Sequence, residues 1–147
     1  MLEHVLFVCT GNTCRSPMAE AIYNHLAQER NLDTIATSAG VMAYDGMPAS
    51  MGAQCAVQAL GADLSFHEAR TVDALMLTGA DLVLCMQDTH ARALSEKFPQ
   101  FREKIHPLTQ YAFGKYTPIA DPFGADREIY DYTAKQIREA ILKILEK

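Results

Sequence analysis

The strongest constraint on the fold is the segment at residues 9–16, which reads CTGNTCRS. The apolar run at residues 5–8 before it is typical of a buried strand. After it, Ser16 is a candidate N-cap and Pro17 suits the first position of a helix. A turn that leads from a strand into a helix gathers backbone N–H groups around a concavity that suits a phosphate. We therefore expect an α/β protein with a phosphate-binding loop after its first strand.

Apolar runs and helical periodicity alternate along the rest of the chain. Strands are predicted at residues 4–9, 34–38, 81–86 and 104–108. Helices are predicted at residues 17–30 and 49–60, after Thr71, at residues 89–98 and from about Arg127, with a loop at residues 111–124. Four strands separated by helices imply a doubly wound parallel sheet, and ligands bind such sheets beyond the carboxyl ends of the strands. We expect residues 1–147 to form a single three-layer domain with a four-stranded parallel sheet flanked by helices.

Composition excludes several classes of function. The chain has 147 residues, of which 49% are hydrophobic, and a formal net charge of −5 without a Lys/Arg cluster, which argues against nucleic-acid binding. The early apolar run is too short for a signal peptide or a membrane span, so we expect a cytoplasmic protein without a membrane partner. The four cysteines are too few for a disulfide scaffold, and no His/Cys spacing is typical of a zinc site. We expect no metal, no cofactor and a monomer.

The loop itself carries the residues that phosphoryl transfer through a thiol needs. Cys9 is the candidate nucleophile, because loop amides, a helix N-terminus and a neighbouring cation all favour a thiolate. Arg15 can hold two phosphoryl oxygens with its planar guanidinium. Gly11 lets the backbone approach a ligand closely, and Ser16 can donate a hydrogen bond to Cys9 as the thiolate leaves. The alternative, a buried structural cysteine before a helix, does not explain the other residues of the segment at residues 9–16.

A leaving group also needs a proton, and Asp121 in the sequence DPFG is the best source. It lies in the long loop before the last helix, where a carboxyl group can reach over a pocket. Pro122 stiffens that loop and Phe123 can form an apolar wall. We expect Asp121 to act first as general acid and then as the base that activates water. Alone, Asp-Pro is only a turn signal.

The other cysteines have two interpretations. If the loop wraps around an anion, the sulfurs of Cys9 and Cys14 come close, and a reversible disulfide between them would protect the nucleophile from irreversible oxidation. Cys14 as a small apolar filler is the alternative. Cys55 and Cys85 are interpreted as packing residues.

These motifs resemble the low-molecular-weight protein phosphatase family over essentially the whole chain. The resemblance rests on the N-terminal loop, on Ser38-Ala39-Gly40, on Ala69-Arg70-Thr71, on residues 81–86 and on Asp121-Pro122-Phe123. It implies a four-stranded parallel sheet, a cysteinyl-phosphate intermediate and no metal, with Cys9 as nucleophile, Arg15 as phosphate ligand and Asp121 as acid and base. It also implies a bracing network of Asn12, Ser16, Ser38 and His67. Substrate contacts are expected from Thr10, Gly11, Asn12, Thr13, Cys14, Ser16 and Phe123.

Two features are similar to the protein-arginine phosphatase branch of this family. That branch has the same CTGNTCRS loop and a DPFG acid loop, whereas tyrosine phosphatases commonly carry an aliphatic residue at the position of Thr13. An aliphatic side chain there would pack on a phosphotyrosine ring. Threonine offers a hydroxyl and admits the planar phosphoguanidinium, with which Asp121 can pair. The resemblance therefore implies phosphorylated proteins as substrates, with phosphoarginine first and phosphotyrosine as the alternative.

Other hypotheses are weaker. An arsenate reductase of this fold needs further cysteines after the third strand, and only Cys85 is present there. A non-catalytic phosphoprotein-binding module would lack the nucleophile or the acid. Met42 and Tyr44 are further candidates for the pocket wall. For Tyr130 and Tyr132, at the start of the last helix, a solvated helix face is favoured over regulatory phosphorylation.

Overall fold

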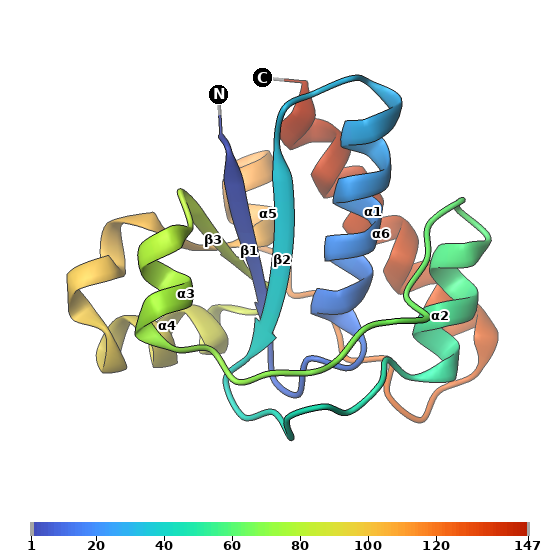
Figure 1. Cartoon of the computed structure of the whole chain (residues 1–147), viewed down its shortest axis with the longest axis horizontal. Coiled ribbons are helices and arrows are strands. Elements are labelled where there is room, and N and C mark those ends of the chain that lie inside the picture. The colour runs from blue at the N-terminus through green and yellow to red at the C-terminus, as the bar shows by residue number, and fades with distance from the viewer. Residues whose placement is uncertain (1, 147) are drawn as a thin grey trace.

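A four-stranded parallel sheet forms the centre of the molecule (Figure 1). The computed structural model describes residues 2–146. The strand order is β2-β1-β3-β4, with bounds β1 His4–Cys9, β2 Ile35–Gly40, β3 Leu82–Cys85 and β4 Ile105–Pro107. Parallel pairing sets Cys9 beside Gly40 and Val8 beside Cys85. The predicted parallel sheet and the order of its strands and helices are confirmed.

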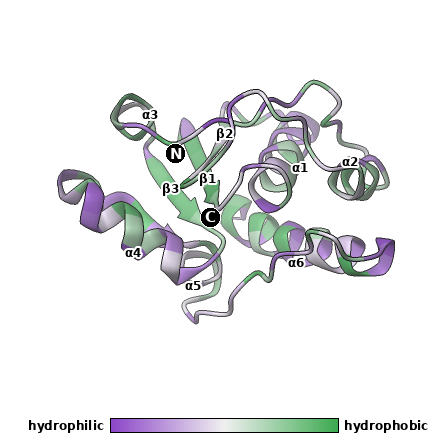
Figure 2. Ribbon diagram, turned by 90° about the horizontal axis from the view of Figure 1, so that it is seen from below, coloured by the Kyte–Doolittle hydropathy of each residue, from purple (hydrophilic) through white to green (hydrophobic). Residues whose placement is uncertain are grey.

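Helices cover both faces of the sheet. The helices are α1 Arg15–Glu29, α2 Met51–Gln58, α3 Ala74–Gly79, α4 Asp88–Lys97, α5 Leu108–Phe113 and α6 Arg127–Leu145, with a 3-10 helix, η1, at Pro99–Lys104. In β1, Val5 and Phe7 pack with α1, α2, α5 and α6, whereas Leu6 and Val8 pack with α3 and α4. This alternation follows from the two-residue period of a strand. Figure 2 shows the apolar strands between the two groups of helices.

The segment after β4 differs from the sequence-based prediction. Residues 111–113, expected in a loop, belong to α5, which buries Leu108, Thr109 and Ala112. Gly114 ends this helix with a φ of 75° and donates its N–H to Gln110 O at 2.8 Å. A glycine in the left-handed conformation is a common helix C-terminus. Gly114, a loop signal in the sequence, closes a short helix in the structure.

The start of α1 also differs. The helix begins at Arg15, and Ser16 is therefore inside the first turn rather than at the N-cap. Cys14 occupies the N-cap without a side-chain capping bond. The Ser16 hydroxyl points back to the loop, where it lies 2.9 Å from Cys9 Sγ. The predicted N-cap is wrong because this hydroxyl has a partner in the loop.

The chain that follows β2 runs alongside the loop after β1. Val41 and Met42 donate their N–H groups to the carbonyls of Cys9 and Thr10, each at 2.9 Å. Gly40 also forms a parallel bridge with Thr71. The loop is therefore held against β2 and the chain before α3, at the carboxyl ends of β1 and β2.

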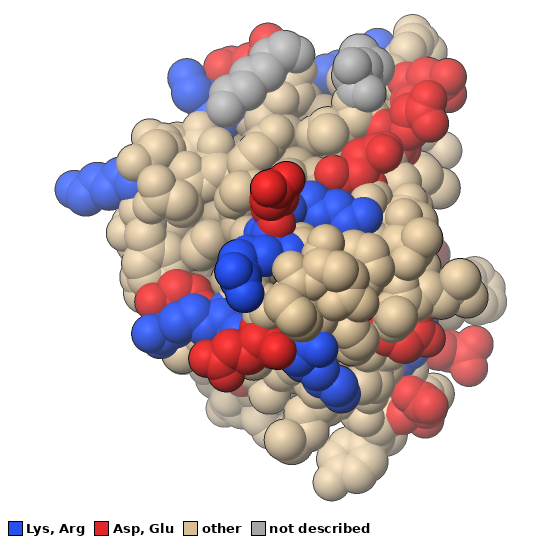
Figure 3. Space-filling model, turned by 90° about the vertical axis from the view of Figure 1, so that its left-hand side faces the viewer, with Lys and Arg blue, Asp and Glu red and all other residues tan. Residues whose placement is uncertain are grey.

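Charged side chains of both signs are interspersed on the face shown in Figure 3. Exposed pairs such as Arg92 and Asp88, 3.7 Å apart, contribute at most about 1 kcal/mol each. Within residues 2–146, no helix combines the length and the apolarity that crossing a membrane requires.

We predict that Gly40→Ala destabilises the protein. A Cβ at Gly40 would lie 2.5 Å from Thr10 O and 3.0 Å from Asn12 N, and backbone atoms cannot swing away as a flexible side chain can. The expected loss is about 1–3 kcal/mol of unfolding free energy, measured by urea denaturation. Gly79→Ala is the control, because nothing lies within 4 Å of its Cβ position. Equal stability of Gly40→Ala and the parent chain would contradict the prediction.

Candidate active site

A pocket of about 220 Å³ lies at the carboxyl end of β1. Its lining consists of Cys9, Thr10, Gly11, Thr13, Cys14, Arg15, Asp121 and Phe123. Cys9 is the last residue of β1 and Arg15 the first of α1, whereas Asp121 comes from the loop before α6. The structure thus brings together the predicted nucleophile, phosphate ligand and acid.

The backbone of the loop is turned so that its carbonyls bond to surrounding segments. Cys9 O and Thr10 O accept from the chain after β2, Asn12 O accepts from His67, and Thr13 O accepts from Ser50 N at 2.9 Å. In a trans peptide the C=O and the next N–H point in opposite directions. We infer that the N–H groups following these carbonyls face the pocket, which is the arrangement that binds an anion.

Asn12 fixes this loop conformation. Its backbone has a φ of 57°, a left-handed conformation that asparagine tolerates better than most residues. The side chain is fully buried, and its amide donates to Ser16 Oγ at 2.9 Å and to Ser38 Oγ at 3.0 Å. Its Oδ1 accepts from Arg70 N at 3.0 Å. Asn12 therefore braces the loop from below, and any contact with a substrate is left to its backbone.

The other predicted bracing residues join the same network. His67 Nε2 donates to Asn12 O at 2.7 Å, because a carbonyl can only accept. Ser38 Oγ donates to Glu20 Oε1 at 2.7 Å, and Arg70 Nε donates to Ser38 O at 3.1 Å. Sequence motifs do not predict Glu20 and Arg70 as bracing residues, because their contacts with Ser38 form only when the chain is folded.

Cys9 is almost completely buried below the pocket. The residue is 2% exposed, and its Sγ lies 2.9 Å from Ser16 Oγ. Ser16 is fully buried and accepts the N–H of Asn12, and its own proton has two acceptors within reach, Cys9 Sγ at 2.9 Å and Ala39 O at 3.3 Å. This leaves Ser16 as a partner of the sulfur rather than as a group at the pocket surface.

Arg15 is held by groups that no sequence motif indicates. Its Nη1 donates to Gln87 Oε1 and to Ile119 O, both at 2.8 Å. Nη2 lies 3.5 Å from Thr10 Oγ1 and 3.9 Å from Asp121 Oδ2. Gln87 follows β3, so the next strand of the sheet orients the guanidinium. A glutamine gives no local signal for this contact.

His90 is a second unexpected support. It is 4% exposed, its Nδ1 accepts from Gln87 N at 3.1 Å, and its Nε2 lies 3.0 Å from Thr10 Oγ1. Because Nδ1 accepts, the neutral ring carries its proton on Nε2 and donates to Thr10. The hydroxyl of Thr10 then accepts from His90 and faces Arg15, so its own proton is free to point into the pocket that it lines.

Asp121 lies at the mouth of the pocket. Its side chain is 51% exposed, and Oδ1 accepts from Phe123 N at 3.1 Å, which forms a tight turn. Its contact with Arg15, at 3.9 Å, is long and partly solvated. The carboxylate therefore faces both the solvent and the guanidinium.

Cys14 contacts three hydroxyls, of which those of Ser50 and Tyr130 are nearer than that of Thr13. Its Sγ lies 3.4 Å from both Ser50 Oγ and Tyr130 OH. Tyr130 was expected on a solvated helix face, but it is 4% exposed and its ring packs against Gly52. Burial, together with the contact to Cys14, raises the pKa of Tyr130 to about 12. Tyr132 is 62% exposed, as expected for a solvated face.

The remaining cysteines lie apart from the pocket lining. Cys85 is fully buried with the residues under α3 and α4, and burial raises the pKa of its thiol. Cys55 is half-buried in α2. This arrangement gives no support to a disulfide relay of the arsenate reductase kind. Within residues 2–146, no group of three or more His, Cys, Asp and Glu side chains is arranged to hold a metal ion.

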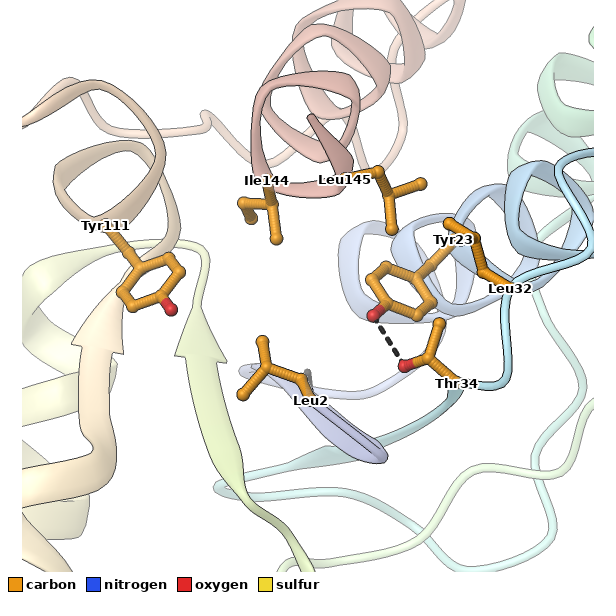
Figure 4. Close-up of a pocket in the computed structure, with 7 residues that line it drawn as sticks. All are labelled: Leu2, Tyr23, Leu32, Thr34, Tyr111, Ile144 and Leu145. Carbon is orange, nitrogen blue, oxygen red and sulfur yellow. Dashed lines mark hydrogen bonds between the residues drawn. The ribbon is translucent and has the colours of Figure 1, made fainter. Parts of the chain in front are cut away.

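Another cavity, of about 380 Å³, lies near the amino ends of β1 and β2 (Figure 4). It is lined by Leu2, Tyr23, Leu32, Thr34, Tyr111, Ile144 and Leu145. Tyr23 OH and Thr34 Oγ1 are paired at 2.8 Å. None of the predicted site residues lines it.

We predict that His90 makes stability depend on pH. Burial and Arg15 lower the pKa of His90 to about 4 from an ordinary 6.5, against the weaker opposite effect of Asp121 and Asp88. The unfolded chain therefore binds a proton in a range where the folded chain does not, and the free energy of unfolding falls as pH drops from 6.5 to 4. The loss attributable to this group is about 3 kcal/mol.

Urea denaturation at several pH values in this window measures the effect. His90→Gln should flatten the dependence, whereas His25→Gln, on the outer part of α1, should keep it. An unchanged slope in His90→Gln would contradict the prediction.

Comparison with known proteins identifies the family. A family model described as low molecular weight phosphotyrosine protein phosphatase matches residues 4–147. The protein-arginine-phosphatase of Bacillus subtilis is 34% identical over 140 residues, which cover 95% of this chain and 93% of the relative. The human low molecular weight phosphotyrosine protein phosphatase is 32% identical over 151 residues, with 99% and 95% covered.

Solved structures agree with these relatives. The low molecular weight protein tyrosine phosphatase from T. tengcongensis superposes with a TM-score of 0.95 at 41% identity and covers 98% of each chain. The arginine phosphatase from Geobacillus stearothermophilus gives a TM-score of 0.91 at 34% identity, covering 98% of this chain and 91% of that one. The chain therefore belongs to the low molecular weight phosphotyrosine protein phosphatase family.

Proposed function

We propose that this protein is a protein-arginine phosphatase, which hydrolyses the phosphorus–nitrogen bond of phosphoarginine in proteins. The observation that carries the proposal is the pocket in which Cys9, Arg15 and Asp121 meet, with Thr13 and Phe123 at its wall. The arginine phosphatases named among the relatives add support. The alternative is a protein tyrosine phosphatase, which the names of other relatives support.

In the proposed first step, the Cys9 thiolate attacks phosphorus and the phosphorus–nitrogen bond breaks. Asp121 protonates the departing nitrogen of the phosphoguanidinium, so the arginine side chain leaves as its ordinary guanidinium cation. Arg15 and the loop N–H groups bind the phosphoryl oxygens, where negative charge gathers in the transition state. Ser16 donates to the sulfur and Thr10 offers its free hydroxyl proton to a phosphoryl oxygen.

In the second step, water attacks the cysteinyl phosphate. Asp121, now a carboxylate, takes a proton from the water, and the sulfur–phosphorus bond breaks to release inorganic phosphate and the Cys9 thiolate. The partial exposure of Asp121 suits this role, because its carboxylate meets both the leaving group and solvent water. A reversible disulfide between Cys9 and Cys14 stays a prediction.

The preference for phosphoarginine is assigned to the rim of the pocket. Thr13 is half-buried there, and its Oγ1 lies 3.8 Å from Cys14 Sγ. A threonine presents one methyl group and one hydroxyl to the substrate, so it packs less well on a phenyl ring than an isoleucine does. Asp121 can also pair with the cationic leaving group, which a phenol is not.

We predict that kcat/KM is at least about tenfold higher on a phosphoarginine peptide than on the matched phosphotyrosine peptide, equivalent to about 1.4 kcal/mol. Thr13→Ile should shift this ratio toward phosphotyrosine, and the exposed Thr78→Ile in α3 should not. Cys9→Ser provides the blank for both peptides. A higher kcat/KM on phosphotyrosine would sink the arginine assignment and leave the alternative.

We predict that Asp121→Asn lowers kcat on phosphoarginine by about 10²–10⁴-fold, because the leaving nitrogen then lacks its proton donor. The fall should be smaller on p-nitrophenyl phosphate, whose leaving group departs without a proton. Asp33→Asn, at the amino end of β2, is the matched control. Equal losses on the two substrates would remove Asp121 from the role of acid.

A further inference from the structure

An apolar cavity of about 510 Å³ adjoins the catalytic pocket. The two share Gly11, Thr13 and Phe123 as a common wall. The rest of the cavity comes from the chain between β2 and α2 and from the first turn of α2, with Met42, Tyr44, Met47, Pro48 and Met51 as its main side chains. The cavity is therefore continuous with the site but separate from its catalytic groups.

The exposed side chains of this cavity are apolar. The exposed fractions are 77% for Met42, 49% for Met47 and 71% for Met51. Exposed apolar side chains that gather around one hollow mark a binding surface rather than ordinary surface scatter. Methionine thioethers also adapt to different partners, because they are unbranched and polarisable.

Two polar side chains of the cavity, Ser50 and Gln54, are already engaged inside the protein. Ser50 Oγ contacts Cys14 and Tyr130 OH and accepts from Ala53 N. Gln54 Nε2 donates to Ala49 O at 2.9 Å. Among residues 2–146, no charged side chain lines the cavity, so a charged occupant would lose hydration without gaining an ion pair, whereas an apolar occupant would gain from burial.

The cavity is also preformed against the catalytic loop. Met42 N donates to Thr10 O, and Ser50 N donates to Thr13 O, each at 2.9 Å. These bonds fix the floor of the cavity to the loop that carries Cys9. To reach the cavity, a peptide whose phosphorylated side chain enters the pocket must cross the shared wall at Thr13 and Phe123. Alternate side chains of an extended peptide lie about 7 Å apart on one face, so a side chain two residues away can enter the adjoining cavity.

We propose that this cavity binds an apolar side chain of the substrate protein, within two residues of the phosphorylated residue. The inference rests on the proposed phosphoprotein phosphatase site, but it holds for phosphoarginine and phosphotyrosine alike. Its consequence is a sequence preference around the phosphorylated residue, set by Met42, Met47 and Met51 rather than by the catalytic groups.

Matched phosphopeptides test the proposal, with leucine or glutamate placed in turn at each of the two positions on either side of the phosphorylated residue. Leucine at one of these positions should raise kcat/KM about tenfold, mainly through a lower KM. Met47→Gln and Met51→Gln should each reduce that preference several-fold, because glutamine keeps the length of methionine but is polar. Leu75→Gln, an exposed apolar residue on α3, should leave it unchanged.

Hydrolysis of p-nitrophenyl phosphate, which lacks flanking residues, reports on the catalytic pocket alone. If Met47→Gln also loses hydrolysis of p-nitrophenyl phosphate, that substitution has disturbed the catalytic pocket. The leucine preference of Met51→Gln, on α2, then decides the outcome. The proposal is overturned if no position favours leucine, or if the preference survives in Met51→Gln. Self-association of the parent chain that Met51→Gln abolishes, without any leucine preference, would assign the cavity to a second copy instead.

Both phosphorylated residues are used in each peptide series, so the two proposals fail separately. A phosphotyrosine preference with a leucine effect contradicts the arginine assignment and supports the cavity. A phosphoarginine preference without a leucine effect supports the arginine assignment and contradicts the proposal for the cavity.

Discussion

The site depends on Asn12, one fully buried residue in a left-handed backbone conformation. Both N–H groups and the oxygen of its side chain are hydrogen-bonded, to Ser16, Ser38 and Arg70. Such a conformation persists only where its surroundings hold it, and this network does so from three parts of the chain. Without it the loop carbonyls could turn inward, and the anion-binding N–H groups would be lost.

The sheet topology explains why the supports come from where they do. Because β1 is flanked by β2 and β3, the carboxyl ends of three parallel strands meet around the loop. The β2 side holds Asn12 through Ser38, whereas the β3 side holds Arg15 through Gln87 and Thr10 through His90. The neighbouring strands thus hold the loop from both sides. Contacts on the β2 side position Asn12, and separate contacts on the β3 side position Arg15 and Thr10.

Local signals predicted the strands, the longer helices and the residues of the pocket. They failed where partners are distant in sequence. Tyr130 is buried where its hydroxyl meets Cys14 and Ser50, which lie 116 and 80 positions earlier in the sequence. His90 and Gln87 carry no motif, since their contacts exist only once β1 and β3 pair. The short helix α5 was missed because its six residues give too little periodicity to outweigh the glycine that ends it.

The wall shared by the two cavities couples the chemistry of the phosphorylated residue to its sequence context. Thr13 and Phe123 line both spaces, so a change at Thr13 alters the fit of the phosphorylated side chain and the shape of the apolar cavity together. Neighbouring residues of this kind are rarely additive in their effects. Thr13→Ile combined with Met51→Gln should therefore give a non-additive change in kcat/KM on peptides. On a small aryl phosphate that fills only the catalytic pocket, the two changes should combine additively.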